Sequence, residues 1–332
     1  MTYNSREKIG VVLFQLGGPD SYDAVEPFLH NLFLDPFIID IPLGFLLRKP
    51  LAKFISKRRS IGVVEDYQTI GQPSPIRDIT DRQSNLLEDE LNKMDPGREY
   101  HTCVAMRYWH PLTEEAVDEI RQIDPDRLIL LPLYPHYSRT TTGSSLYEWE
   151  QQIKDTSVTE IPSQLIESYH TYTPYINSVV DHVESTIESC CDSQEELHLL
   201  FSAHGVPLKV IKNGDPYQQH IERSVQLVME GLSTTYPHHL SYQSKVGPQK
   251  WLEPATIDIL QRLGSEGVNH LLVVPIAFVS DHLETLYELN IEDREIAEHA
   301  GISNYHVMKA LNDSSLFIQA LAQRVMEEVH HE

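Results

Sequence analysis

The sequence has few cysteines and no long apolar run. Its three cysteines, Cys103, Cys190 and Cys191, form no CxxC pair, which argues against a disulfide framework and fits a reducing compartment. The longest apolar runs, such as 271–277, fall far short of the ~20 residues that span a bilayer. The first twenty residues lack the charged, apolar and small-residue parts of a signal peptide. We therefore expect a cytoplasmic protein.

Basic residues are also scarce. The chain has 26 Lys and Arg against 49 Asp and Glu, a net charge of −23. A chain this acidic repels phosphate backbones, so we expect no nucleic-acid partner. A dinucleotide fingerprint is missing too, because Pro19 follows Gly17-Gly18 after the first apolar run and the GxGxxG spacing is absent.

Short apolar runs alternate with longer amphipathic stretches along the chain. The runs that predict strands are 9–14, 102–106, 128–133, 164–168, 197–202, 240–242, 271–275 and 305–308. The stretches that predict helices are 78–93, 113–123, 174–189, 216–232, 254–263 and 315–329. This alternation predicts an α/β fold with parallel strands, either as two sets of four or as a single eight-stranded sheet. In both arrangements, ligands bind at the carboxyl ends of the strands.

One segment differs from the rest in charge. Residues 41–64 contain no Asp or Glu, and their apolar side chains alternate with six basic ones, Arg48, Lys49, Lys53, Lys57, Arg58 and Arg59. Such a segment suits an anionic membrane surface or the mouth of a site for an apolar, anionic ligand. An ordinary amphipathic helix with a solvated basic face is the alternative.

A histidine stands where the predicted strand 197–202 ends. His204 would lie at the edge of the ligand crevice, and its imidazole could accept a proton near neutral pH or bind a metal. A structural histidine is the alternative at this position.

A row of acids follows the predicted strand 271–275. Asp281, Glu284 and Glu288 are spaced to share one face of a helix, and Glu292 extends the row. The helix dipole accounts for acids in the first turn but not for the last two. The row therefore suits a path for a cation or for protons.

Polar and aromatic residues follow other strands. They include 107–110, 134–145 and 243–251. Aromatic faces combined with hydroxyl and cationic donors suit a flat aromatic ligand that carries carboxylates.

These motifs together resemble the ferrochelatase family, which inserts ferrous iron into protoporphyrin. The motifs that carry the resemblance are 200–207, 213–217, 243–248 with Trp251-Leu252, and 275–288, supported by Gly17-Gly18-Pro19, Arg107-Tyr108 and 134–145. The resemblance implies two similar Rossmann-like domains, each with a four-stranded parallel sheet flanked by helices. Their expected bounds are 1–170 and 171–311, with a helix over 312–332 packing back on the first domain and a porphyrin cleft between the two.

The resemblance also assigns roles to residues. It implies that His204 is the catalytic histidine and that Glu284 is its acidic partner across a gap wide enough for a tetrapyrrole, both also contacting the metal. Asp281, Glu288 and Glu292 would relay protons or metal. The residues expected to contact the porphyrin are Leu16, Arg58, Arg59, Arg107, Tyr108, Tyr134, Ser138, Trp251 and Phe278.

Partners and cofactors follow from the same resemblance. We expect protoporphyrin IX and Fe²⁺ as substrates and no permanently bound cofactor. A [2Fe–2S] cluster is not expected, because Arg139 occupies the position of one cluster cysteine of some relatives. Residues 43–60 resemble the lip of members that use protoporphyrin, which implies a peripheral contact with the membrane. The alternatives are a chelatase for coproporphyrin or sirohydrochlorin, and a porphyrin or haem carrier without catalysis.

Overall fold

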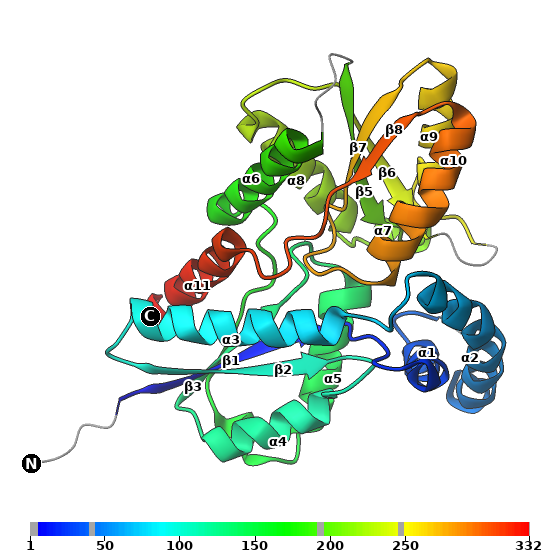
Figure 1. Ribbon diagram of the computed structural model, residues 1–332. Coiled ribbons are helices and arrows are strands. Elements are labelled where there is room, and N and C mark those ends of the chain that lie inside the picture. Colours follow the sequence, from blue (N-terminus) through cyan, green and yellow to red (C-terminus); the bar gives the residue numbers. More distant parts are fainter. Residues whose placement is uncertain (1–5, 40–43, 191–195, 245–248, 332) are drawn as a thin grey trace, which may run out of the picture. The chain divides into compact units, whose positions relative to one another are not determined.

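The chain folds into two compact units in a computed structural model that describes residues 6–39, 44–190, 196–244 and 249–331 (Figure 1). Unit 1 comprises Met1–Tyr134, Ser138–Ser168 and Ile318–Glu332. Unit 2 comprises Pro135–Tyr137 and Tyr169–Phe317.

The sheet of unit 1 has four parallel strands. They are β1 (Lys8–Gln15), β2 (Glu99–Met106), β3 (Arg127–Pro132) and β4 (Ser163–Leu165), in the order β2-β1-β3-β4. The central strand β1 is buried along seven of its eight residues. A strand covered on both faces needs apolar side chains at successive positions, and the β1 sequence KIGVVLFQ supplies them.

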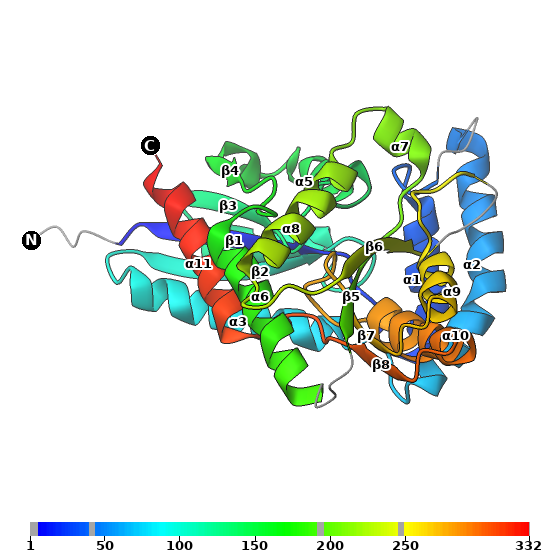
Figure 2. The same ribbon diagram turned by 90° about the horizontal axis from the view of Figure 1, so that it is seen from above.

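Helices cover both faces of this sheet, as Figure 1 shows. On one face, α4 (Thr113–Ile123) and α5 (Ser144–Ile153) pack on β1, β2 and β3 through a core that includes Phe14, Ile120 and Trp149. On the other face lie α3 (Ile76–Met94) and α11 (Ser315–His330). A helix pair, α1 (Val25–Leu34) and α2 (Gly44–Thr69), lies beyond the carboxyl ends of β1 and β2 (Figures 1 and 2).

Unit 2 repeats the same topology. Its strands β5 (Leu197–His204), β6 (His238–Gln243), β7 (His270–Val274) and β8 (Asn304–Val307) are parallel, in the order β6-β5-β7-β8. One face packs on α9 (Thr256–Ser265) and α10 (Asp293–Ala300), as seen from above in Figure 2. The unit also contains α6 (Thr173–Cys190), α7 (Leu208–Lys212) and α8 (Tyr217–Gly231).

The predicted fold class is confirmed. Two four-stranded parallel sheets are present, so the single eight-stranded sheet is wrong. Each of the eight predicted strands overlaps an observed one. The helices α1, α5, α7 and α10 were not predicted, because they are short or lie in segments that read as loops. Across the described ranges, none of the helices combines the length and the apolar character that crossing a bilayer requires.

The glycine turn after β1 serves the protein's own packing. Gly17 has φ +84°, which a side chain would strain. A Cβ at Gly18 would collide with the side chain of Ser74, whose backbone N–H donates to the Pro19 carbonyl at 3.0 Å. The close approach that the two glycines allow is therefore made here by the loop before α3.

Candidate functional site

Strand β5 carries His204 to the carboxyl edge of the unit 2 sheet. In the parallel register His204 pairs with Gln243, the last residue of β6. The Tyr217 hydroxyl donates to the His204 carbonyl at 3.0 Å and fixes the end of the strand. A Cβ at Gly205 would lie 2.8 Å from the Gln243 carbonyl oxygen, so glycine is required for this close approach.

His204 forms a direct hydrogen bond with Glu284. Its Nδ1 lies 2.9 Å from Glu284 Oε2, with side-chain exposures of 38% and 21%. His282 is on the other side of the same carboxylate, with Nε2 3.8 Å from Glu284 Oε2. The expectation that a tetrapyrrole-wide gap separates His204 from Glu284 is therefore wrong: the two groups form one unit.

The acidic row starts later than predicted and has a different helical form. Glu284–Glu292 is a π-helix, η4, and Asp281 lies before it. Asp281 is buried, and its oxygens accept hydrogen bonds from the Thr285 hydroxyl at 3.0 Å, the Ala310 N–H at 3.0 Å and the Asn312 amide at 2.7 Å. We correct its placement on the helical face: Asp281 holds the loop together. Single π-helical turns occur often at functional sites.

Glu288 follows Glu284 along η4 and is held by the end of β6. The Ser244 hydroxyl donates to Glu288 Oε2 at 2.5 Å, and the Gln243 amide lies 3.4 Å from the same oxygen. Glu292 is exposed, whereas its neighbour Asp293 is buried. The row thus leads from the His204–Glu284 pair toward solvent.

Neighbouring charges decide which of these groups are ionised. Burial would lower the pKa of His204, but the charge and hydrogen bond of Glu284 outweigh burial and raise it above the usual 6.5. Burial would raise the pKa of Glu284, yet His204 and His282 hold it well below 4.5. Glu284 is therefore ionised at neutral pH.

Glu288 and Asp293 behave in the opposite way. Burial, together with the charge of Glu284, raises the pKa of Glu288 to about 7. Burial and the charges of Glu288 and Glu292 raise the pKa of Asp293 to about 7 as well. These two carboxyl groups can therefore take up or release protons near neutral pH.

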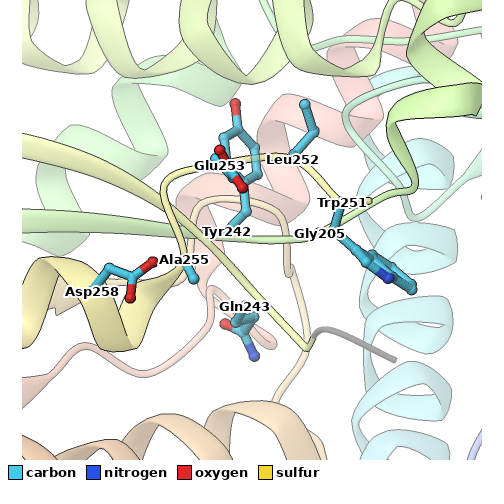
Figure 3. A pocket seen from close by; sticks show the side chains of 8 residues that line it. All are labelled: Gly205, Tyr242, Gln243, Trp251, Leu252, Glu253, Ala255 and Asp258. Atoms are coloured by element: carbon cyan, nitrogen blue, oxygen red, sulfur yellow. The ribbon is translucent and has the colours of Figure 1, made fainter. Parts of the chain in front are cut away.

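Two predicted aromatic residues also lie in unit 2. The Phe278 ring meets His204 edge-on at 6.4 Å between centroids and His282 at 4.5 Å. Trp251 lies at a pocket beside Gly205 and Tyr242 (Figure 3). That pocket holds about 30 Å³, room for one or two water molecules and far too little for a tetrapyrrole.

A second group of predicted residues gathers in unit 1. Arg107 and Tyr108 follow β2, and both contact Asp35, which was not predicted: Tyr108 donates to it at 2.6 Å and Arg107 Nη2 lies 3.2 Å away. Tyr134 and Ser138 follow β3 and are buried. The Ser138 hydroxyl accepts the Thr140 N–H at 3.2 Å and so begins a short helical turn over 139–143.

The remaining predicted contacts lie at the edges of unit 1. Leu16 follows β1 and packs against the core. Arg58 and Arg59 are exposed on α2, and the Arg59 guanidinium lies over the Phe33 ring at 5.9 Å. Residue 43 of the predicted lip lies outside the described residues.

No preformed metal cluster is present within the described ranges: no three His, Cys, Asp or Glu side chains gather there to hold an ion. Cys103 is a buried free thiol, Cys190 is half-buried, and Cys191 lies outside those ranges. The Arg139 guanidinium lies over the Phe37 ring at 5.7 Å.

Sequence reasoning gave no role to four residues that the structure places in contact with the predicted ones: Asp35, Tyr217, Ser244 and His282. His282 was within reach, since it stands two residues before Glu284. Asp35 gave no signal, because its partner Tyr108 is more than forty residues away. Ser244 lies in the predicted polar stretch 243–251, but its contact with Glu288, also more than forty residues away, could not be predicted from spacing.

The comparisons with known proteins agree with one another. The family model described as Ferrochelatase matches residues 8–329. A protein named Ferrochelatase from Picosynechococcus is 44% identical over 324 residues, covering 97% of this chain and 83% of that one. One of the same name from Synechocystis is 44% identical over 325 residues, with the same coverage.

Two solved structures share the fold. SirB from Bacillus subtilis has a TM-score of 0.54 at 10% identity, covering 98% of this chain and 96% of that one. DR2241 from Deinococcus radiodurans has a TM-score of 0.52 at 9% identity, covering 95% of this chain and 54% of that one. At these identities the likeness concerns the fold alone.

The contact between His204 and Glu284 predicts how the pKa of His204 responds to loss of the carboxylate. Glu284→Gln keeps the shape of the side chain but removes the charge that opposes burial. We expect the pKa of His204 to fall in this variant, because desolvation then acts with less opposition. Histidine NMR signals followed against pH measure it, with the His204 signal identified by its loss in His204→Ala.

Glu295→Gln, an exposed site on α10, is the control and should leave the titration unchanged. An unchanged or higher pKa of His204 in Glu284→Gln would show that the carboxylate does not govern this imidazole.

Proposed function

Because the chain belongs to the ferrochelatase family, as its sequence motifs predicted, we propose that it inserts Fe²⁺ into protoporphyrin IX with release of two protons. The observation that carries this proposal is the His204–Glu284 hydrogen bond at the carboxyl end of β5. A free-base porphyrin must lose two pyrrole N–H protons before a divalent metal can enter its plane, and this pair is built to accept them.

The hydrogen bond assigns a task to each ring nitrogen of His204. Nδ1 faces the Glu284 carboxylate, so the neutral imidazole carries its proton on Nδ1 and donates it to Glu284. Nε2 is then the unprotonated nitrogen that accepts the pyrrole proton. The carboxylate stabilises the imidazolium that forms, as a buried carboxylate does in hydrolase triads.

Protons then leave along η4. Glu288 titrates near neutral pH and lies within the electrostatic reach of both Glu284 and His204. Glu292 is exposed and opens this row to solvent. We propose that Glu288 and Glu292 carry protons between His204 and bulk water.

Fe²⁺ is a substrate in the proposed reaction. Imidazole and carboxylate suit Fe²⁺, and a site with few ligands releases the ion readily. We propose His204 and Glu284 as its transient contacts, with no permanently bound cofactor and no [2Fe–2S] cluster. Residues that follow β1, β2 and β3 in unit 1 (Leu16, Arg107, Tyr108, Tyr134 and Ser138) are proposed to contact the porphyrin, with Arg58, Arg59, Trp251 and Phe278.

Metallation of the porphyrin by purified protein tests this function. Under anaerobic conditions with Fe²⁺, the wild type should convert the absorption bands of protoporphyrin to those of protohaem. His204→Ala should lower the rate at least about a hundredfold, because proton acceptance typically contributes 10²–10⁴-fold. Porphyrin binding, measured by fluorescence quenching, should change little.

His198→Ala is the matched control on the same strand, at its amino end, and should retain the activity. Parallel reactions with coproporphyrin and sirohydrochlorin test the substrate. Faster metallation of either would contradict the protoporphyrin assignment. Stoichiometric binding without metallation would identify a carrier instead.

We propose that the protein works in the cytoplasm with α2 in peripheral contact with an anionic membrane surface. Leu47, Phe54 and Ile61 are 51%, 64% and 67% exposed and recur every seven residues, so they share one face of α2. The exposed basic side chains of Lys49, Lys53, Lys57, Arg58 and Arg59 accompany them. Apolar burial combined with attraction to anionic lipid binds such helices to an interface.

Sedimentation with lipid vesicles measures this contact. The wild type should bind vesicles that contain phosphatidylglycerol, and more weakly at high salt. Phe54→Ser combined with Ile61→Ser should weaken binding at least about tenfold, since two large apolar side chains lose their burial. Ile257→Ser, at a 46% exposed site on α9, is the control. Equal binding by all three proteins would contradict a membrane contact through α2.

A further inference from the structure

Asp35 is a buried carboxylate at the junction of several segments of unit 1. It follows the last residue of α1, and its side chain is fully buried. One oxygen accepts the Phe37 N–H at 2.7 Å. The other accepts hydrogen bonds from the hydroxyls of Tyr108, at 2.6 Å, and Ser144, and faces Arg107. A buried carboxylate with this many donors holds the surrounding side chains in fixed positions, because each donor would lose a buried partner if it moved.

Arg107 uses its whole guanidinium group to contact Asp35 and the side chains around it. Its Nε donates to the Ser144 hydroxyl at 2.8 Å, Nη1 lies 3.5 Å from Glu148 and Nη2 lies 3.2 Å from Asp35. All three guanidinium nitrogens therefore face acceptors inside unit 1, and the side chain is 11% exposed. The guanidinium also lies over the Tyr108 ring at 5.1 Å. Arg107 thus holds Tyr108 in place.

The segment that Asp35 joins to these side chains is the α1–α2 arm, defined here as the described residues of 25–69. The arm meets the end of β2 through Phe28, whose ring meets Tyr108 edge-on at 6.4 Å, and through Asn31, which donates to the Tyr108 carbonyl at 3.1 Å. These contacts are apolar or neutral. Asp35 supplies the ionic contact between the arm and Arg107.

We propose that Asp35 is a positioning residue that couples the α1–α2 arm to Arg107 and Tyr108 and thereby sets the affinity for the porphyrin. The inference rests on the proposed function, which places Arg107 and Tyr108 at the porphyrin. Asp35 touches neither the metal nor the reacting nitrogens in this account. Its loss therefore affects binding of the porphyrin and leaves the metallation step nearly intact.

Asp35→Asn isolates the charge. The hydroxyls of Tyr108 and Ser144 can reverse and accept from an amide, but a guanidinium has donors only and cannot. Arg107 would then face an amide in place of a carboxylate, while the volume of the side chain is kept. Glu148→Gln is the matched control, because Glu148 also pairs with Arg107 but lies on α5, outside the arm.

The experiment measures kcat, the KM for protoporphyrin and the KM for Fe²⁺, together with amide hydrogen exchange. In Asp35→Asn we expect the KM for protoporphyrin to rise about tenfold, the loss of one charge-assisted contact. The kcat and the KM for Fe²⁺ should stay within about threefold, well below that shift. Amide exchange over 29–39 and 107–108 should accelerate. Glu148→Gln should change neither the porphyrin KM nor the exchange.

Three results would overturn the proposal: a lower kcat with an unchanged porphyrin KM, equal effects of Asp35→Asn and Glu148→Gln, or unchanged amide exchange in Asp35→Asn. If Asp35→Asn fails to fold, Ser144→Ala removes one neighbouring donor and should raise the porphyrin KM by a smaller factor; an unchanged KM overturns the proposal. Failure of the wild type to metallate any porphyrin would instead refute the proposed function, and the exchange data would still test whether Asp35 couples the arm to Arg107 and Tyr108.

Discussion

The hydrogen bond between His204 and Glu284 is the interaction on which the rest of the site depends. It joins the end of a strand to the start of a π-helix eighty residues later in the chain. It keeps Glu284 ionised and raises the pKa of His204. Burial, together with the charge of the ionised Glu284, raises the pKa of Glu288. This contact therefore sets the protonation of His204 and Glu284 and contributes to that of Glu288.

The sequence was informative where backbone periodicity carries the signal. Alternating strands and helices predicted the parallel sheets, and the rule that ligands bind at the carboxyl ends of strands pointed to His204. Side-chain contacts were harder, because residue spacing cannot tell a π-helix from an α-helix. Nor does spacing show that the helix begins only at Glu284, which leaves Asp281 before it. The separation of Glu284 from His204 was implied by the family resemblance, and the hydrogen bond between the two contradicts it.

Asp35 and Glu288 show two ways to bury a carboxylate. Asp35 is surrounded by hydrogen-bond donors and faces the Arg107 guanidinium, so its negative charge is compensated and it holds its neighbours in place. Glu288 has the Ser244 hydroxyl and the Gln243 amide beside it but also the charge of Glu284, so it titrates near neutral pH. A carboxyl group that exchanges protons near neutral pH needs the second environment, in which burial and a neighbouring like charge disfavour its ionised form.

A double-mutant cycle on metallation tests most directly whether His204 and Glu284 act as one unit. Rates of His204→Ala, Glu284→Gln and the double variant are compared as kcat/KM. Groups that work together lose their joint contribution when either is removed. We therefore expect the double variant to be no slower than the more damaged single variant, within about threefold. Losses that multiply in the double variant would show that the two residues act independently and would contradict the account.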